Sequence, residues 1–406
     1  MNKTGVDSRA GWIVVAAEIG LIMMTMGTTY LLWVGLKPIA ADFGWPREVP
    51  SLANSLQMIG TGLGGIAMGR WFDRVGLGPP VLAGTLAIVL GSVLLAFIDA
   101  AWQLHLINAV LIGFIGNGAM FAPLLTNTTR WFERRRGLAV AIVAAGQGLS
   151  GAVWPPVFEL AIESVGWRDA SLYYGLACLA VMLPLILVVR RPAPSATADA
   201  ATTSGGAAGR VAGLPVHTPH AILALGILTC CIAMAVPLVH IVAHVSDLGF
   251  DSARGAQLLS FIMVLSFGSR IGIGVMADRF GALPSLLVGS ALQALGLFLF
   301  IFATGEVALF AAAVVFGLGF GGLIPCYAVA VRALYPPADT GWRVGVVFFG
   351  GSIGMAIGGW MAGTVFDRLG SYVPAFTAAF GANVVNLLLL GFLASCLWRS
   401  SQRRFA

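Results

Sequence analysis

Arg270 is the residue of this chain whose type and position point most directly to chemistry. It lies in an apolar stretch, 255–277, that holds no other charge, eight residues before Asp278, or about 12 Å along a helix. A membrane has a hydrocarbon layer about 30 Å thick, so an Arg at this depth costs roughly 2.5–3.5 kcal/mol or more and needs an anion. Because a guanidinium matches a carboxylate with two parallel hydrogen bonds, we expect Arg270 to bind a carboxylate. A structural ion pair, or an Arg that reaches toward the interface, is the alternative.

Glu18 is the second deep charge. It lies nine residues after Arg9, which is about 13 Å along a helix. Thr25 and Thr29 share its helix face, whereas Tyr30 lies about 120° away. A buried carboxyl group is a candidate proton carrier. The alternative is a structural Glu that hydrogen-bonds to another helix.

His240 and His244 lie near the outer end of a predicted span, with Asp247 one turn further on. Their spacing fits a zinc pair, but the chain has no HExxH motif and no third close ligand, so we expect no metal site. Histidine titrates near neutral pH, so His240 with Asp247 is a candidate for proton sensing or gating. Otherwise these are polar residues at the outer rim.

The elements that hold these residues are predicted to be membrane helices. The 406 residues are 58% hydrophobic and 10% charged, whereas soluble domains carry roughly 25% charged residues. This composition excludes an ordinary soluble enzyme, a disordered chain and a nucleic-acid module. We expect an all-α polytopic membrane protein with twelve spans, since each span needs about 20 apolar residues. The predicted spans are 12–37, 49–72, 79–99, 102–129, 136–163, 169–190, 220–246, 253–277, 282–303, 306–334, 341–367 and 371–398.

The segment 191–219 is the linker of this chain, because it is rich in Ala, Pro, Gly, Ser and Thr. It divides the chain into two predicted six-helix bundles, residues 1–190 and 220–406. Most of the 23 Lys and Arg residues fall on one side if the N-terminus is inside. The linker and both termini are therefore predicted to be cytoplasmic. The compact loops favour a bacterial inner membrane.

The pattern GxxxDRxG occurs three times, starting at Gly69, Gly274 and Gly363, and closes the second, eighth and eleventh spans. Such repetition is typical of repeated three-helix units, some of them inverted. An Asp at a loop can cap a neighbouring helix for roughly 0.3–1 kcal/mol, which is weak enough to break during a transport cycle. A plain turn with inside-positive charge is the alternative. The predicted gating residues are Gly69, Asp73, Arg74, Asp278 and Arg279.

The chain resembles the major facilitator superfamily in its twelve spans, its central linker and its loop motif after helices 2 and 8. Within it, the sequence RWFERRRGLA before helix 5, from Arg130 to Ala139, is similar to a signature of monocarboxylate porters. Further similarity covers Tyr30 to Trp45, Pro237 to Gly255 and Thr340 to Arg343. The resemblance implies that the helix 8 Arg, here Arg270, holds the substrate carboxylate. It also implies a cavity lined mainly by helices 1, 4, 7 and 10. The remaining candidates on cavity helices are Tyr30, Asn54, Asn117, Phe121, Gln147, Ser266, Tyr327 and Ser352, each of which has helix packing as its alternative.

Two departures from the family affect the proton mechanism. Animal monocarboxylate porters carry a Lys in helix 1 where this chain has Tyr30, and an Asp one turn before the helix 8 Arg where it has Ser266. The related oxalate exchanger has a second basic residue in helix 11, whereas 344–366 is uncharged here. One buried positive charge argues for one carboxylate. Proton coupling then falls to Glu18 or His240, or is absent.

The sequence therefore predicts a secondary transporter of a small monocarboxylate such as lactate or pyruvate, with a proton as co-substrate and lipid as its surroundings. No catalytic residue, metal, cofactor or nucleic-acid partner is expected. Proton-independent antiport or uniport, and export of another small organic compound, are the nearest alternatives. A sensor without flux and an intramembrane zinc hydrolase at the two histidines are more distant ones.

Overall fold

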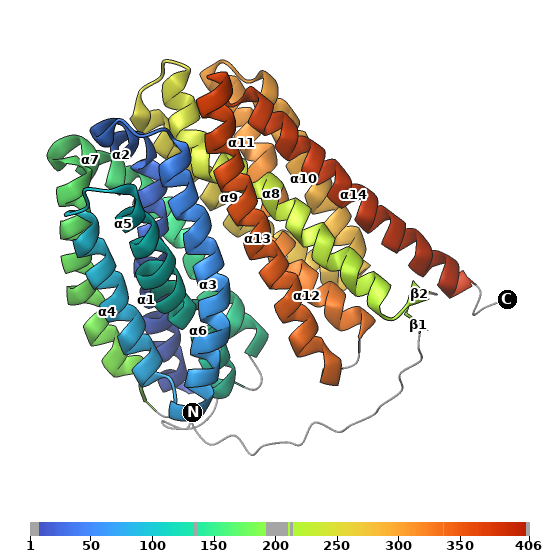
Figure 1. Cartoon of the computed structure of the whole chain (residues 1–406). Helices are drawn as coiled ribbons and strands as arrows, with labels where there is room; N and C mark the ends of the chain where they lie inside the picture. Colours follow the sequence, from blue (N-terminus) through green and yellow to red (C-terminus); the bar gives the residue numbers. More distant parts are fainter. Residues whose placement is uncertain (1–7, 133–135, 192–209, 212–213, 336, 403–406) are drawn as a thin grey trace. The chain divides into compact units, whose positions relative to one another are not determined.

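The computed structural model describes residues 8–132, 136–191, 210–211, 214–335 and 337–402. These residues fall into two compact units, Met1–Asp199 with Asp251–Ser260, and Ala200–Phe250 with Phe261–Ala406. Figure 1 shows the helices of both units, coloured by their position in the sequence. Of the predicted linker 191–219, positions 192–209 and 212–213 lie outside the described residues.

The first unit holds six membrane spans. One is built from three consecutive pieces, α5, a π-helix (η1) and α6, and two more are joined within α7, where Gly166 leaves helical geometry with φ 82° and ψ 161°. The helices are α1 (Arg9–Val34), α2 (Leu36–Phe43), α3 (Glu48–Val75), α4 (Gly78–Leu95), α5 (Ala101–Leu106), η1 (Ile107–Asn117), α6 (Gly118–Trp131) and α7 (Arg136–Val189). The short helix α2 and the π-helix are features that the hydropathy pattern does not reveal.

The second unit begins with a two-stranded antiparallel hairpin, β1 (Arg210–Val211) and β2 (Leu214–Pro215). Six spans follow it, and one of them is divided into α11 and α12 by Gly321 and Gly322. The helices are α8 (His217–Asp247), α9 (Ser252–Phe280), α10 (Ala282–Phe302), α11 (Glu306–Phe320), α12 (Leu323–Leu334), α13 (Pro337–Leu369) and α14 (Val373–Gln402). The start of α9, up to Ser260, belongs to the first unit.

The described residues thus form twelve spans, which confirms the predicted all-α polytopic fold. Ten helical segments are long and apolar enough to cross a membrane by composition alone. One of them, Ile142–Val189, contains two spans, and α3 adds the remaining one. Large apolar side chains such as Leu160, Phe302 and Leu388 are about two-thirds exposed. Such surfaces are covered by lipid in a membrane and would aggregate in water.

Each copy of the GxxxDRxG pattern ends a helix at a glycine with positive φ. The angle is 81° at Gly76, 90° at Gly281 and 66° at Gly370. Residues other than glycine rarely adopt a positive φ. A glycine adopts it at little cost, and the chain then leaves the helix. The last glycine of the pattern therefore has a structural reason that is independent of any gating role.

Glycines also permit backbone contact between helices. A Cβ atom at Gly64 of α3 would overlap the backbone of Phe114 in η1, and one at Gly354 of α13 would overlap the backbone of Leu228 in α8. Packing of this kind holds membrane helices together, because lipid provides no hydrophobic drive for helices to associate. Gly64 and Gly354 therefore serve close helix packing.

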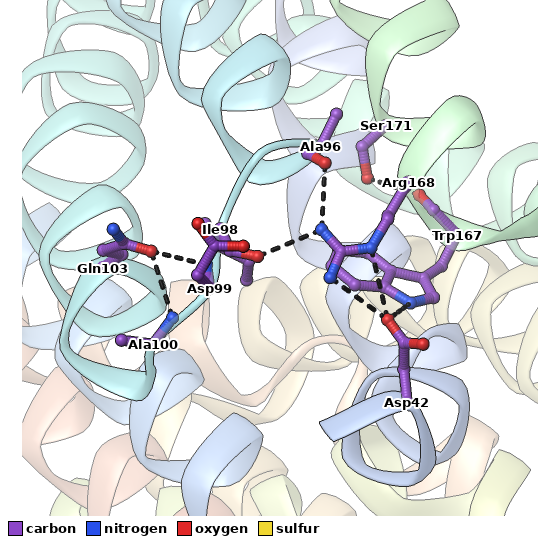
Figure 2. A network of polar contacts seen from close by, with 9 residues as sticks. All are labelled: Asp42, Ala96, Ile98, Asp99, Ala100, Gln103, Trp167, Arg168 and Ser171. Carbon is purple, nitrogen blue, oxygen red and sulfur yellow. Dashed lines mark hydrogen bonds and ion pairs between the residues drawn. The ribbon is translucent and has the colours of Figure 1, made fainter.

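Arg168 ties together neighbouring ends of helices of the first unit, as Figure 2 shows. Its Nη1 donates to the carbonyl oxygens of Ala96 and Ile98, each at 3.0 Å. Its Nη2 forms an ion pair with Asp42 at 3.2 Å, and Asp42 also accepts from the indole of Trp167 at 3.3 Å. One side chain thus joins α2, the connection between α4 and α5, and the second half of α7.

Candidate functional site

Arg270 lies in α9 and reaches the break between α11 and α12. Its Nε donates to the carbonyl oxygen of Gly321 at 3.1 Å, and its side chain is half-buried. Gly321 follows the last residue of α11 and precedes Gly322, the N-cap of α12. The predicted carboxylate-binding residue is thus anchored to a discontinuous helix, an arrangement that places backbone polar groups beside a substrate in many transporters.

The chain leaves the Gly321 carbonyl without a helical donor for a simple reason. Its partner in an α-helix would be the N–H four residues later, at position 325, which is Pro. Proline has no N–H, and a buried carbonyl without a donor is costly. The guanidinium of Arg270 supplies the missing donor and uses one of its five N–H groups to do so.

Small residues bring α9 against this break. A Cβ atom at Gly321 would overlap the carbonyl oxygen of Ser266, and one at Gly317 would lie 2.9 Å from Cβ of Leu265. Ser266, one turn before Arg270, donates its hydroxyl to Met263 in its own helix at 2.8 Å. The hydroxyl of Ser269 donates to Leu318 at 2.6 Å. The sequence did not single out Ser269, although its place beside Arg270 was a signal.

Ser352, another predicted binding residue of this unit, lies in α13. Its hydroxyl donates to Phe348 of the same helix at 3.3 Å. Gly350 and Gly354 pack on α8, and Ser352 is two residues from each, so it lies on the opposite side of α13. Its side chain is half-buried.

Glu18 is fully buried in the first unit and is held by the end of α6. Asn127 Nδ2 lies 2.8 Å from one carboxyl oxygen, and Thr128 Oγ1 lies 2.6 Å from the other. Both partners are more than one hundred residues away in the chain, and no sequence pattern pointed to them.

A second polar group in the first unit joins α1 to α3. Gln57 donates to Thr29 at 2.8 Å, and the indole of Trp33 donates to Asn54 at 2.8 Å. Tyr30 is buried and packs edge-on against Trp33, with ring centroids 5.2 Å apart. Four buried atoms of this region have no hydrogen-bond partner among the described residues: Thr25 Oγ1, Asn54 Nδ2, Gln57 Oε1 and Asn117 Oδ1. Buried polar atoms of this kind are where water or a polar ligand binds.

Asn117 is the last residue of the π-helix η1 and is buried. π-helical segments occur frequently at functional sites, so its position supports the choice of this residue. Phe121 of α6 and Gln147 of α7 are both half-buried. Gln147 has Met26 within weak hydrogen-bonding distance, with 3.9 Å between Nε2 and Sδ.

His240 links three helices of the second unit. Its Nδ1 lies 3.1 Å from the hydroxyl of Tyr372, which precedes α14, and its Nε2 lies 2.8 Å from the carbonyl oxygen of Gly359 in α13. Because a carbonyl only accepts, Nε2 carries a hydrogen, while the tyrosine hydroxyl can serve Nδ1 in either protonation state. The ring therefore fits this place as a neutral or a charged group. Asp247, the last residue of α8, is exposed.

The predicted gating residues lie at the ends of α3 and α9. Arg74, Asp278 and Arg279 are exposed, and a Cβ atom at Gly69 would meet no described atom within 4 Å. Asp73 is in the last turn of α3, but its side chain lies outside the described residues.

The predicted residues fall into two groups by unit. The first unit holds Glu18, Tyr30, Asn117, Phe121 and Gln147, and the second holds Arg270, Ser266, Ser352, His240 and Asp247. Within the second unit, the structure brings Arg270 and Ser266 to the same helix break. Within the first, it reveals Asn127 and Thr128 as partners of Glu18.

Comparison with known families gives a direct match. Residues 19–305 and 271–404 match the family model of the Major Facilitator Superfamily. Human monocarboxylate transporter 11 is 30% identical over 391 residues, covering 91% of this chain and 80% of the human protein. Rat monocarboxylate transporter 13 is 27% identical over 419 residues, covering 98% of this chain and 92% of the rat protein. The MFS-type transporter pynF of Aspergillus niger is 24% identical over 365 residues, covering 89% of this chain and 82% of the fungal protein.

Solved structures share the fold. The nucleoside transporter NupG superposes with a TM-score of 0.75 at 12% identity, covering 95% of this chain and all of NupG. A bacterial homologue of the human lysosomal transporter Spinster superposes with a TM-score of 0.72 at 13% identity, covering 97% of both chains. At these identities the likeness concerns the fold alone.

Proposed function

The chain belongs to the Major Facilitator Superfamily, and from this premise we propose that it carries a small organic monocarboxylate, such as lactate or pyruvate, across the membrane together with a proton. Its family and its relatives make it a multi-pass membrane transporter and not an enzyme. Transport proceeds by alternating access, in which the protein opens to one side of the membrane and then to the other.

The observation that carries this proposal is the placement of Arg270. The guanidinium is attached to the broken span by the hydrogen bond to Gly321, and the planar fork of a guanidinium suits the two oxygens of a carboxylate. The resemblance to monocarboxylate porters supports the same role for this residue. A positive charge inside a span is costly without an anion. A bound carboxylate would neutralise the charge of Arg270 and offset this cost.

The charge of the proposed substrate follows from the number of positive charges within the predicted spans. No second Lys or Arg lies deep in a span, and α13 is uncharged between Val344 and Phe366. A second carboxylate would enter without a positive partner, and its desolvation would go uncompensated. A monocarboxylate is favoured over a dicarboxylate for this reason. Tyr30, Asn117, Phe121, Gln147, Ser266 and Ser352 complete the proposed binding residues.

Proton coupling is proposed because a monocarboxylate that enters with a proton adds no net charge to the membrane interior. Glu18, His240 and Asp247 are the proposed groups for it. A proton-independent antiporter or uniporter of organic anions is the second candidate, favoured by the absence from this chain of the family's helix 1 Lys and helix 8 Asp. Export of another small organic compound on the same fold is a further alternative, since the matched relatives include fungal transporters.

We place the protein in a bacterial inner membrane with both termini on the cytoplasmic side. The excess of Lys and Arg in the loops assigned to that side supports the orientation. The compact loops support the assignment to a bacterial inner membrane. The relatives named above are eukaryotic.

The proposal is tested by counterflow of radiolabelled lactate, pyruvate and oxalate into proteoliposomes, with and without an inward proton gradient. We expect exchange of the two monocarboxylates, little exchange of oxalate, and uptake that the gradient increases. An exchange rate that does not change with the proton gradient would favour antiport or uniport. Absence of flux for all three acids would remove this substrate class.

A further inference from the structure

Glu18 is a buried carboxyl group whose described neighbours are hydrogen-bonding and uncharged. We infer that Glu18 is protonated in this conformation, and that Asn127 and Thr128 build it into a proton-binding site that joins α1 to α6. The inference rests on the proposed function only in identifying this proton as the one that moves with the substrate. Asn127 and Thr128 are positioning residues of this site.

Two hydrogen-bonding side chains hold the carboxyl group, and one of them has a further contact. Asn127 Nδ2 lies 2.8 Å from Oε1 of Glu18, and Thr128 Oγ1 lies 2.6 Å from Oε2. The same Thr128 oxygen also lies 3.0 Å from the carbonyl oxygen of Leu124, one turn earlier in α6. Glu18, Asn127 and Thr128 are all buried, and Glu18 and Thr128 have no exposed surface.

Each protonation state of Glu18 requires a different direction of the Thr128 hydroxyl. A threonine hydroxyl has one hydrogen, but Thr128 lies near two oxygens, the Glu18 carboxyl and the Leu124 carbonyl. If Glu18 carries the proton, Oε2–H donates to Thr128, Thr128 donates to Leu124, and Asn127 donates to Oε1. Both carboxyl oxygens, the carboxyl hydrogen and the hydroxyl hydrogen of Thr128 then have a partner.

If Glu18 is ionised, the hydroxyl of Thr128 must turn to the carboxylate and leave Leu124. A full negative charge is then fully buried with two neutral donors and with no cation among its described contacts. Burial of an ionised carboxylate without a counter-charge is far more costly than burial of a neutral acid. The geometry therefore favours the neutral acid.

The described parts of the elements packed around Glu18 bring no positive charge to it. On α7, residues 139–158 hold no charged residue, and α4 has none at all. On α6, the guanidinium of Arg130 lies over the ring of Phe72 at 4.3 Å. Arg9 begins α1 and is exposed, and Arg70 and Arg74 near the end of α3 are exposed as well.

The position of the site gives its proton a mechanical consequence. Beyond Thr128, α6 ends at Trp131, and Phe132 then packs against the first turn of α1 with its ring 4.9 Å from that of Trp12. The acid thus forms a buried polar link within a contact between two helix ends. Loss of the proton places a charge inside that contact, and the charge is stabilised only if the ends separate and admit water. Proton release and opening between α1 and α6 would therefore occur together.

Two measurements test the inference. The first is the infrared absorption of protonated carboxyl groups in the purified protein at neutral pH, compared with Glu18→Gln and with Glu159→Gln. Glu159 is a second buried glutamate of this unit and serves as the control. A glutamine fits the Glu18 site, because its amide can donate to Thr128 and accept from Asn127. We expect Glu18→Gln to remove one acid band, Thr128→Val to shift it, and Thr128→Ser to retain it.

The second measurement is transport by the same variants. Glu18→Gln should retain substrate exchange. The ratio of uptake with a proton gradient to uptake without one should fall to about one in this variant. Glu159→Gln should keep the stimulation of the unmodified protein. Absence of an acid band from Glu18 would overturn the inference, and so would full stimulation in Glu18→Gln. If the unmodified protein moved none of the acids, the proposed function would fail, and the infrared band alone would still decide whether Glu18 holds a proton.

Discussion

The Nε–H of Arg270 donates to the carbonyl oxygen of Gly321 across 3.1 Å, in place of the backbone N–H that Pro325 lacks. This contact explains two features at once. It satisfies the carbonyl left over at the break between α11 and α12, and it fixes the stem of the Arg270 side chain. The break and the Arg therefore position each other, and changing either should affect the other.

Pro325→Ala tests this relationship without touching the charge. Alanine restores an N–H that can bond to the Gly321 carbonyl, so that α11 and α12 can continue as one helix and Arg270 loses its anchor. We expect substrate affinity to fall several-fold while thermal stability in detergent stays equal or rises. Pro123→Ala, which removes a proline from within α6 of the first unit, is the matched control. Unchanged affinity in Pro325→Ala would show that the anchor does not matter for binding.

Gly321→Ala should damage the same place by crowding. A Cβ atom there would overlap the carbonyl oxygen of Ser266, so α9 and the broken span must move apart. We expect a loss of about 1–3 kcal/mol of stability and a larger loss of uptake than in Gly391→Ala. A Cβ atom at Gly391 of α14 would meet no described atom within 4 Å. Equal effects of the two substitutions, measured by thermal unfolding and uptake, would argue against tight packing at the break.

His240→Ala should weaken the second unit, because it removes the contacts to Gly359 and Tyr372. Each lost hydrogen bond costs about 0.5–1.5 kcal/mol, and the cavity adds to this cost. Tyr372→Phe removes one of the two contacts and should cost less, about 0.5–1.5 kcal/mol. Thermal unfolding of both variants in detergent checks the order. If Tyr372→Phe were the more damaging, the bond to Gly359 would not be the main contribution of this histidine.

Arg168→Gln should loosen the helix ends that this residue joins in the first unit. The substitution removes the ion pair with Asp42 and the contacts to two carbonyl oxygens. The side chain is 35% exposed, so the ion pair itself contributes little, and we expect a total loss of about 1–2 kcal/mol from the carbonyl contacts. Asp42→Asn, which leaves those carbonyl contacts in place, should cost less. Similar losses for both would assign the stability to the ion pair instead.

Much of the fold follows from the sequence because hydropathy and helix breakers report on local structure. All twelve predicted spans are present in the described residues. The break at Gly321 was readable in principle, since Pro325 follows two adjacent glycines. The π-helix over Ile107–Asn117 was not, because that segment is as apolar as an ordinary span.

The site was less predictable, because its contacts join distant parts of the chain. Depth along a helix identified Arg270 and Glu18 from their distance to a charged helix end. It could not identify Thr128, which lies 110 residues from Glu18, or Tyr372, which lies 132 residues from His240. Periodicity indicates which face of a helix is apolar, but it does not tell which residue on another helix meets a given polar group.

The most direct test of the central claim is lactate counterflow by Arg270→Ala and Arg270→Lys in proteoliposomes, with each variant first checked for folding by its thermal unfolding. We expect Arg270→Ala to lose exchange while remaining folded. We expect Arg270→Lys to retain only a small part of the exchange, because an ammonium offers a point charge where the carboxylate requires a planar fork. Exchange by folded Arg270→Ala at the rate of the unmodified protein would contradict the assignment of this residue to the substrate carboxylate.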